Sequence, residues 1–245
     1  MDLLIGWLYG TKMNIYGDRG NVIVIEQRAR WRGIDVRTQE IGLGEPIPAD
    51  VDLFFFGGGQ DQEQVAVSHD LQGAKGEAIR RAVEDGAALL AVCGGYQLLG
   101  RGYFPHDAAP LPGISLFDAD SVAGPERFIG NVVVDTPFGA LVGFENHSGL
   151  TNLGPTATPL GKVRVGRGNN GKDGSEGARR HHVYGTYLHG PVLPANAQFA
   201  DALIKAAVDR AFSRGFEPED LDDTLADEAQ QRQITRLLTG RNKPH

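Results

Sequence analysis

The chain has 245 residues, which is enough to bury a sizeable core as one large domain or two small ones. It carries 24 basic and 31 acidic residues, and a net charge of −7 argues against bulk binding of nucleic acid or anionic membrane. No apolar run reaches the length of a membrane span, and the amino terminus lacks the basic start of a signal peptide. The single cysteine excludes an internal disulfide, so we expect a cytoplasmic protein.

The first half of the chain alternates between continuous apolar runs and segments with helical periodicity. Such runs lack polar alternation, as strands do when helices cover both faces of a parallel sheet. The alternation predicts an α/β fold with a mostly parallel sheet and helices on both faces. The expected strands are Leu3–Tyr9, Ile34–Ile41, Val51–Phe56 and Ala87–Val92, and the expected helices are Val22–Trp31, Gly73–Asp85 and Gly94–Gly100.

The middle of the chain has short strand candidates separated by Gly, Pro and Asn, which indicates an antiparallel extension at the edge of the sheet. These candidates are Ile114–Phe117, Ile129–Val134, Leu141–Glu145 and Lys162–Val165, followed by a strand at Val183–Leu188 and a helix at Asn196–Arg214. The tail from Glu217 is acidic and then amphipathic. Since no linker interrupts the chain, we expect one domain over residues 1–214. Residues 215–245 would form a helical tail packed on that domain or extending it.

The only cysteine, Cys93, lies where a buried strand meets the next predicted helix, in the segment Ala91–Gln97. A nucleophile on such a turn is exposed at the carboxyl end of the sheet. Gly94 leaves its backbone N–H open to an oxyanion, and a helix N-terminus favours the thiolate over the thiol. The alternative is a buried small hydrophobe, the commonest fate of a lone cysteine. The flanking glycines favour the nucleophile.

Two further features follow predicted strands and should reach the same edge of the sheet. The turn Gly57–Gly59 could supply a second oxyanion donor through its N–H groups. His189 could accept the thiol proton and return it to a leaving amine. His147 also follows a strand and is a rival for this role, whereas His181–His182 is expected to be a loop pair. No recognised ligand spacing among the histidines supports a metal site.

The glycine-rich segment Gly166–Gly177 matches the glycine and lysine part of a P-loop, but only that part. Asp173 stands where a P-loop needs Ser or Thr for magnesium, and no helix is predicted to follow. We therefore interpret the segment as a surface loop and expect no ATP site in it.

Three separated motifs, taken in chain order, resemble those of class I glutamine amidotransferases, and most closely those of the cobyric-acid-synthase-like branch. They are Gly57–Gly59, Cys93–Gln97 and Tyr187–Gly190. Within that branch, Gly57–Gln64 and Gly143–His147 look like the glutaminase subunits of lipid II isoglutaminyl synthases. The resemblance covers about residues 3–210, and it implies a flavodoxin-like class I glutamine amidotransferase fold.

The resemblance also implies hydrolysis of L-glutamine without a cofactor or a metal. Cys93 would attack the carboxamide, and backbone N–H groups at Gly58 and Gly94 would hold the oxyanion. His189 would protonate the departing ammonia and then activate water to cleave the glutamyl thioester.

Two side chains are expected to bind the substrate by the same resemblance. Arg127 would pair with the α-carboxylate, for which a guanidinium is a suitable bidentate partner. Gln97, within the nucleophile motif, would also contact glutamine. Without the resemblance, a surface salt bridge would be the preferred interpretation of Arg127.

The sequence departs from the common pattern of these enzymes at two positions. Ala91 replaces the first Gly of the usual nucleophile turn, and Pro191 replaces the Glu that usually lies two residues after the catalytic histidine. The cobyric-acid-type branch shares the second departure. A Cys–His dyad therefore remains, or an orienting acid from elsewhere, with Asp18 and Glu145 as the candidates.

A glutaminase without an ATP motif requires that the acceptor be activated elsewhere. Cobyric-acid-type enzymes carry an ATP-binding domain ahead of the amidotransferase domain, whereas here the resemblance starts near residue 3, which favours a free-standing subunit. The implied partner is a Mur-ligase-like, ATP-dependent subunit in a heterodimer. It would use the ammonia to amidate D-glutamate in the lipid II stem peptide.

Four other interpretations stay open at this point. The chain could be the glutaminase subunit of another amidotransferase, with a different acceptor. It could be a cysteine hydrolase or peptidase that acts on γ-glutamyl compounds through a wider pocket. It could be a regulatory module whose Cys93 is inert. It could be a metal-dependent hydrolase, in which case chelators would remove its activity.

Overall fold

The structure, a computed structural model, describes residues 2–59, 61–212, 217 and 219–240. Its first sheet is parallel except for one edge strand. The strands are β1 (Asp2–Leu8), β2 (Asp35–Ile41), β3 (Leu53–Phe56), β4 (Ala88–Val92), β11 (Ala178–Arg180) and β12 (Val183–Thr186). They follow the order β11-β12-β4-β3-β1-β2, and β11 is the antiparallel member.

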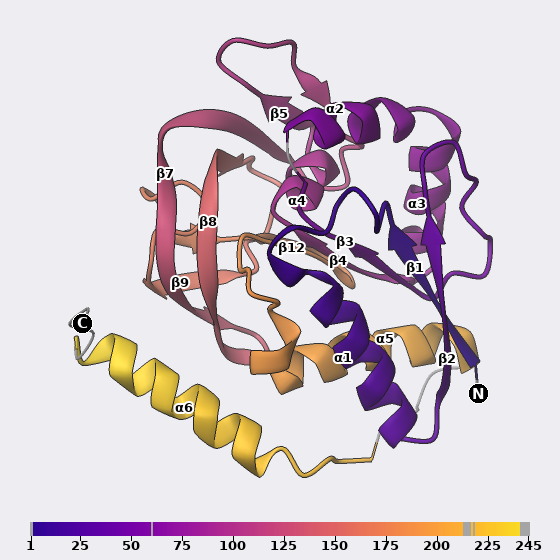
Figure 1. The fold of residues 1–245 in the computed structure, drawn as a ribbon, viewed down its shortest axis with the longest axis vertical. Helices are drawn as coiled ribbons and strands as arrows, with labels where there is room; N and C mark the ends of the chain where they lie inside the picture. Colours follow the sequence, from indigo (N-terminus) through magenta and orange to yellow (C-terminus); the bar gives the residue numbers. More distant parts are fainter. Residues whose placement is uncertain (1, 60, 213–216, 218, 241–245) are drawn as a thin grey trace.

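Helices cover both faces of this sheet, as predicted. The helices on one face are α1 (Arg19–Trp31) and α5 (Ala197–Phe212), and those on the other are α2 (Asp61–Asp70), α3 (Ala74–Glu84) and α4 (Gly94–Leu99) (Figure 1). In β3, Leu53 and Phe55 pack in the core under α1 and α5, while Phe54 and Phe56 pack in the other. The apolar runs are thus strands buried on both sides, and the mostly parallel α/β fold is confirmed.

The strands of the middle region form a second sheet rather than only extending the first, and all its pairs are antiparallel except that of β5 with β7. They are β5 (Gly102–Phe104), β6 (Leu111–Pro112), β7 (Ala119–Thr136), β8 (Gly139–Leu153), β9 (Gly161–Val165) and β10 (Ser175–Glu176). The order is β10-β9-β7-β5-β6, and β8 also pairs with β7. Among the described strands of the first sheet, only β11 is an antiparallel addition at the edge.

The strand predicted at Ile114–Phe117 is wrong. The segment is a buried loop whose backbone N–H groups bond to the end of α4: that of Ile114 reaches the carbonyl of Leu98 over 2.9 Å, and that of Phe117 reaches Leu99 over 3.0 Å. The apolar side chains belong to the core, but the backbone satisfies carbonyl groups that a helix end leaves without partners.

Other boundaries differ from the prediction by a few residues. Helix α1 begins three residues earlier than expected, α2 was not expected, and the last two residues of the predicted helix Asn196–Arg214 lie outside the described residues. Two 3-10 turns, η1 (Ile15–Gly17) and η2 (Leu193–Ala195), complete the described elements. None of the described helices combines the length and the apolar character that crossing a bilayer requires.

The described part of the tail forms α6 (Thr224–Leu238), which lies along the second sheet (Figure 1). Its buried Ile234 packs against Val133 of β7 and Val142 of β8, and Leu237 adds to the same cluster. The amphipathic pattern of the tail therefore corresponds to one covered face.

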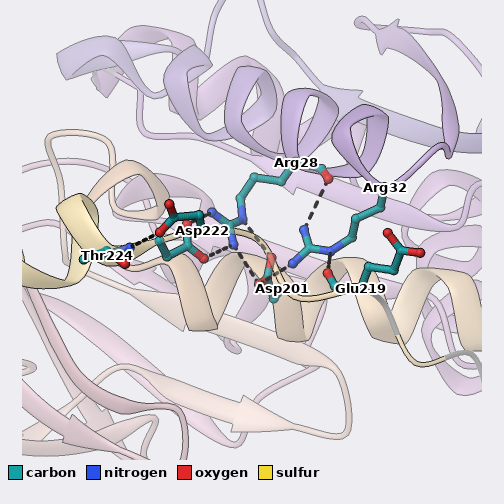
Figure 2. Close-up of polar contacts among 7 residues, drawn as sticks. Arg28, Arg32, Asp201, Glu219, Asp222 and Thr224 are labelled. Carbon is teal, nitrogen blue, oxygen red and sulfur yellow. Dashed lines mark hydrogen bonds and ion pairs between the residues drawn. The ribbon is translucent and has the colours of Figure 1, made fainter.

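A buried guanidinium ties this tail to the first sheet's helices (Figure 2). Arg28 of α1 makes bidentate ion pairs with Asp201 of α5 and with Asp223, the residue before α6, over 2.6–2.7 Å. Arg32 adds a bond of 2.7 Å to Asp201 and one of 2.8 Å to the carbonyl of Glu219. A guanidinium that forms two parallel N–H···O bonds with one carboxylate makes a strong, geometrically specific ion pair.

We predict that Arg28→Met destabilises the fold by about 2–4 kcal/mol, because it leaves Asp223 without its bidentate partner and leaves Asp201 paired with Arg32 alone. Urea unfolding measures the loss, and amide hydrogen exchange should accelerate in α6. Arg37→Met is the matched control, since Arg37 forms an exposed pair with Asp50 and should cost less than about 1 kcal/mol. Equal losses for the two variants would contradict the prediction.

Candidate active site

The turn from β4 to α4 holds Cys93 in a backbone conformation that only a constrained site maintains. Its φ and ψ are 50° and −109°, in a region that residues other than glycine seldom occupy. Gly95 has to be glycine, because a Cβ there would lie 2.6 Å from the carbonyl oxygen of Phe56. The sequence-predicted nucleophile turn is therefore present, at the carboxyl end of the parallel sheet.

His189 follows β12 and lies in the same site. Its side chain is 1% exposed, and its backbone forms a bridge with Phe144 of β8, with N–H···O distances of 2.8 and 3.3 Å. Burial by itself would lower the pKa of His189, but Asp18 and Cys93 together raise it to about 10. Asp18 and Cys93 thus favour the protonated form of the imidazole.

Of the two candidate orienting acids, Asp18 is the one beside His189. Its Oδ1 lies 3.8 Å from Nδ1 of His189, and it is completely buried. Its Oδ2 accepts the N–H of Gly58 over 2.7 Å. This N–H, which was expected to help hold the oxyanion, is thus engaged by a carboxylate in this structure.

The other candidate acid, Glu145, has a different role. Its carboxylate accepts the N–H groups of Arg167 and Gly168 over 2.9–3.1 Å, and burial raises its pKa. These bonds anchor the glycine-rich segment against β8.

The interpretation of Gly166–Gly177 as a surface loop is only partly right, because Asn169 is fully buried and bonds to Gly177. As expected, no helix follows this segment: β10 lies within it, and β11 comes next.

A cavity of about 470 Å³ opens beside the nucleophile. The predicted substrate-binding residues Arg127 and Gln97 both line it, together with Cys93. Side chains or backbone that the sequence analysis did not assign to a substrate site complete the wall: Ile15, Tyr16, Gly59, Gln62, Glu63, Gln64, Tyr103, Asn146, His147, Ser148 and Gly149. Gln60, within the glycine motif, lies outside the described residues.

The two predicted substrate-binding side chains differ in how free they are. Arg127 is exposed, and its Nη1 bonds to Asn146, at 3.1 and 3.3 Å. Gln97 is buried: its Nε2 donates to the Tyr187 hydroxyl over 3.1 Å, and its Oε1 accepts from Gln64 over 2.8 Å. Arg127 is thus available to an anion at the cavity mouth, whereas Gln97 is held within the wall.

Tyr16 was missed in the sequence, where nothing distinguishes it. Its φ of 55° places it in the left-handed region, and its ring meets that of His189 edge-on with centroids 5.0 Å apart. The side chain is half exposed, so Tyr16 covers the histidine from the solvent side.

The pair His181–His182 forms the turn between β11 and β12, as expected. Across the described residues, no group of three or more His, Cys, Asp or Glu could hold a metal ion.

Behind the site, Glu176 of β10 fastens the end of β12. Its Oε1 accepts the Thr186 hydroxyl over 2.5 Å and the N–H of Tyr187 over 2.9 Å. Burial raises the pKa of Glu176 to about 7, partly offset by these hydrogen bonds. The carboxyl group holds the strand three residues before His189.

A strained cysteine at a strand-to-helix turn, with a buried histidine and a carboxylate beside it, is the arrangement that cysteine-dependent acyl transfer on an open α/β sheet requires. Comparison with known proteins narrows this class. Residues 4–197 match the family described as the CobB/CobQ-like glutamine amidotransferase domain. The chain belongs to this family.

Two curated relatives match over nearly their whole length. Both are named lipid II isoglutaminyl synthase (glutamine-hydrolyzing) subunit GatD. The one from Staphylococcus aureus is 39% identical and covers 96% of each chain; the one from Streptococcus pneumoniae is 35% identical and covers 92% of this chain and 88% of its own. A cobyric acid synthase from Methylorubrum populi is 32% identical, but only 35% of its length is matched.

Solved structures confirm the fold. PurLQS from Thermotoga maritima has a TM-score of 0.57 at 14% identity and covers 86% of this chain and 97% of its own. A glutamine amidotransferase from the same organism has a TM-score of 0.51 at 16% identity and covers 98% and 97%. The predicted class I glutamine amidotransferase fold is therefore right.

We predict that Glu176→Gln stabilises the protein above pH 7. A carboxyl group whose pKa is raised by folding binds its proton more tightly in the folded state, so its contribution is lost as pH rises from about 4.5 to about 7. An amide carries no charge at any pH and can still accept from Thr186. The gain should be roughly 2–3 kcal/mol at pH 8 and vanish near pH 4. Urea unfolding at both pH values checks this, and a pH-independent difference would contradict it.

Proposed function

We propose that this chain is the glutaminase subunit of a lipid II isoglutaminyl synthase. The observation that carries the proposal is the match to two GatD subunits over nearly the full length of both chains. The site supports it, because Cys93 and the exposed Arg127 border one cavity of a size that suits an amino acid, and His189 is buried beside Cys93.

In the proposed reaction, the Cys93 thiolate attacks the carboxamide carbon of L-glutamine. The cationic His189 donates its proton to the nitrogen as the C–N bond breaks, which releases ammonia and leaves a glutamyl thioester. The neutral imidazole then takes a proton from water, whose attack on the thioester gives glutamate and restores the thiolate.

Backbone N–H groups would stabilise the oxyanion of each tetrahedral intermediate. Gly94 opens α4, where the first N–H groups have no acceptor within the helix. Gly58 is the second proposed donor. Since its N–H donates to Asp18 in the free chain, this role requires the carboxylate to release it when substrate binds.

Asp18 would replace the acid that Pro191 excludes from the position after His189. Its free Oδ1 lies 3.8 Å from Nδ1, a distance that a small movement would close to a hydrogen bond. It would then hold the ring and stabilise the imidazolium.

Substrate recognition would rest on Arg127 and Gln97. The guanidinium of Arg127 at the cavity mouth would pair with the α-carboxylate. Gln97 would shape the wall through its bonds to Gln64 and Tyr187.

The ammonia would pass to a MurT-like Mur ligase subunit in a heterodimer. That partner would use ATP to activate the α-carboxylate of D-glutamate in the lipid II stem peptide, giving D-isoglutamine for peptidoglycan synthesis. The need for ATP would place the complex in the cytoplasm. This acceptor is proposed because the two GatD relatives are named for lipid II.

We predict that Cys93→Ala lowers glutamate release from L-glutamine by at least about 10³-fold, and His189→Ala by roughly 10²–10⁴-fold. The assay uses the full chain with and without the MurT-like partner. His106→Ala, in an exposed loop, is the matched control and should retain wild-type activity. Activity that survives Cys93→Ala would overturn the mechanism.

We predict that Asp18→Asn lowers kcat/KM for glutamine by roughly 10²-fold, since the amide cannot stabilise the imidazolium. Because Asp18 contributes to the raised pKa of His189, its loss should move the alkaline limb of the pH profile from near 10 to lower pH. Asp50→Asn, an exposed change, should leave both unchanged. If the alkaline limb of the kcat/KM profile does not move in Asp18→Asn, Asp18 does not act on His189, and the prediction is contradicted.

A further inference from the structure

The imidazole of His147, on β8, is fixed by contacts with two aromatic rings. Its ring stacks on that of Tyr187, with centroids 3.6 Å apart and planes 6° from parallel. The ring of Phe128 meets it edge-on at 5.5 Å. The two contacts fix both the position and the tilt of the imidazole.

The hydrogen bonding of His147 defines which nitrogen carries its proton. Nδ1 lies 2.7 Å from the carbonyl oxygen of Gly149, and a carbonyl only accepts, so Nδ1 is the protonated nitrogen. Burial lowers the pKa of His147 to about 4, and the charges of His189 and Arg127 act in the same direction. At neutral pH, Nε2 is therefore a fixed lone pair that can only accept.

Nε2 has no hydrogen-bond donor within the described residues. His147 is only 2% exposed, so this acceptor is also shielded from solvent. A buried acceptor without a donor destabilises a fold, so such atoms mark a site that something else completes. His147 lines the cavity that Cys93 also lines, and the hydroxyl of its stacking partner Tyr187 contacts Gln97 in that wall. Neither the nucleophile nor the general acid of the proposed mechanism uses it.

We propose that Nε2 of His147 accepts a hydrogen bond from the carboxamide N–H₂ of L-glutamine and so positions the leaving nitrogen. The inference rests on the proposed glutaminase function. His147 shares its cavity with Cys93, and Phe144, three residues earlier on β8, pairs with the backbone of His189. These contacts favour the carboxamide end of the substrate over its α-amino end.

The arrangement gives selectivity as well as position. An amide nitrogen offers two N–H donors, whereas the γ-carboxylate of glutamate offers only lone pairs, which the lone pair of Nε2 repels. The site would therefore bind the substrate and disfavour the product. Because one N–H is held by His147, the nitrogen can direct its developing lone pair toward the proton of His189 as the C–N bond breaks.

The test compares two substrates and two matched variants. L-glutamate γ-methyl ester has the same acyl group as L-glutamine but no N–H on its leaving group. In His147→Asn, the shorter amide can still donate to Gly149 but does not reach the position of Nε2. In His147→Gln, the longer amide brings an oxygen acceptor to that position, and both variants lose the aromatic stack.

For His147→Asn, the ratio of kcat/KM for glutamine to that for the ester should fall about 10-fold or more. For His147→Gln, it should stay within about 3-fold of wild type. Equal ratios in all three proteins would overturn the inference, because a structural role lowers both substrates together. If either variant fails to fold, His147→Phe provides the same ratio test while keeping the stack.

The failure of this inference is distinct from the failure of the proposed function. Wild-type protein that hydrolyses neither substrate, even with the MurT-like partner, would overturn the glutaminase proposal and this role with it. Wild-type protein that hydrolyses both, with unchanged ratios in the variants, would overturn only the role of His147.

Discussion

The left-handed turn at Cys93 is the constraint on which the rest of the site depends. A strand and a helix can meet this sharply only if the neighbouring backbone passes close by, and Gly95 allows it to lie against the end of β3. The same packing brings the Gly57–Gly59 turn beside the thiol. Three strands of one parallel sheet thus bring Cys93, the glycine turn and His189 to one edge without any long loop.

Asp18 shows how a remote segment can approach a histidine that has no carboxylate near it in sequence. Pro191 stands two residues after His189, and the carboxylate beside the imidazole comes from the turn before α1. One carboxylate then faces two groups, the imidazole and the N–H of Gly58. His189 and the N–H of Gly58 are consequently coupled through a single side chain.

Much of the first sheet and of the site could be predicted because the signals are local. Apolar runs mark doubly covered strands, and the residues after them mark the functional edge. The choice between Asp18 and Glu145 was beyond reach, since it depends on contacts between segments far apart in sequence. The segment Ile114–Phe117 misled for a related reason: its apolar side chains report burial, which a core loop shares with a strand. The orphan nitrogen of His147 likewise has no trace in the sequence.

The attachment of α6 restricts where a large partner can sit. The helix covers Val133 and Val142 on the second sheet, and Arg28 secures the approach to it through Asp223. A protein that docked there would have to displace α6 and provide Arg28 with a carboxylate in place of Asp223. The described residues place no helix over Arg127, and the exposed Ile129 and Phe144 lie on the paired strands β7 and β8. The tail helix therefore restricts docking on its own face of the second sheet, whereas Arg127 stays exposed.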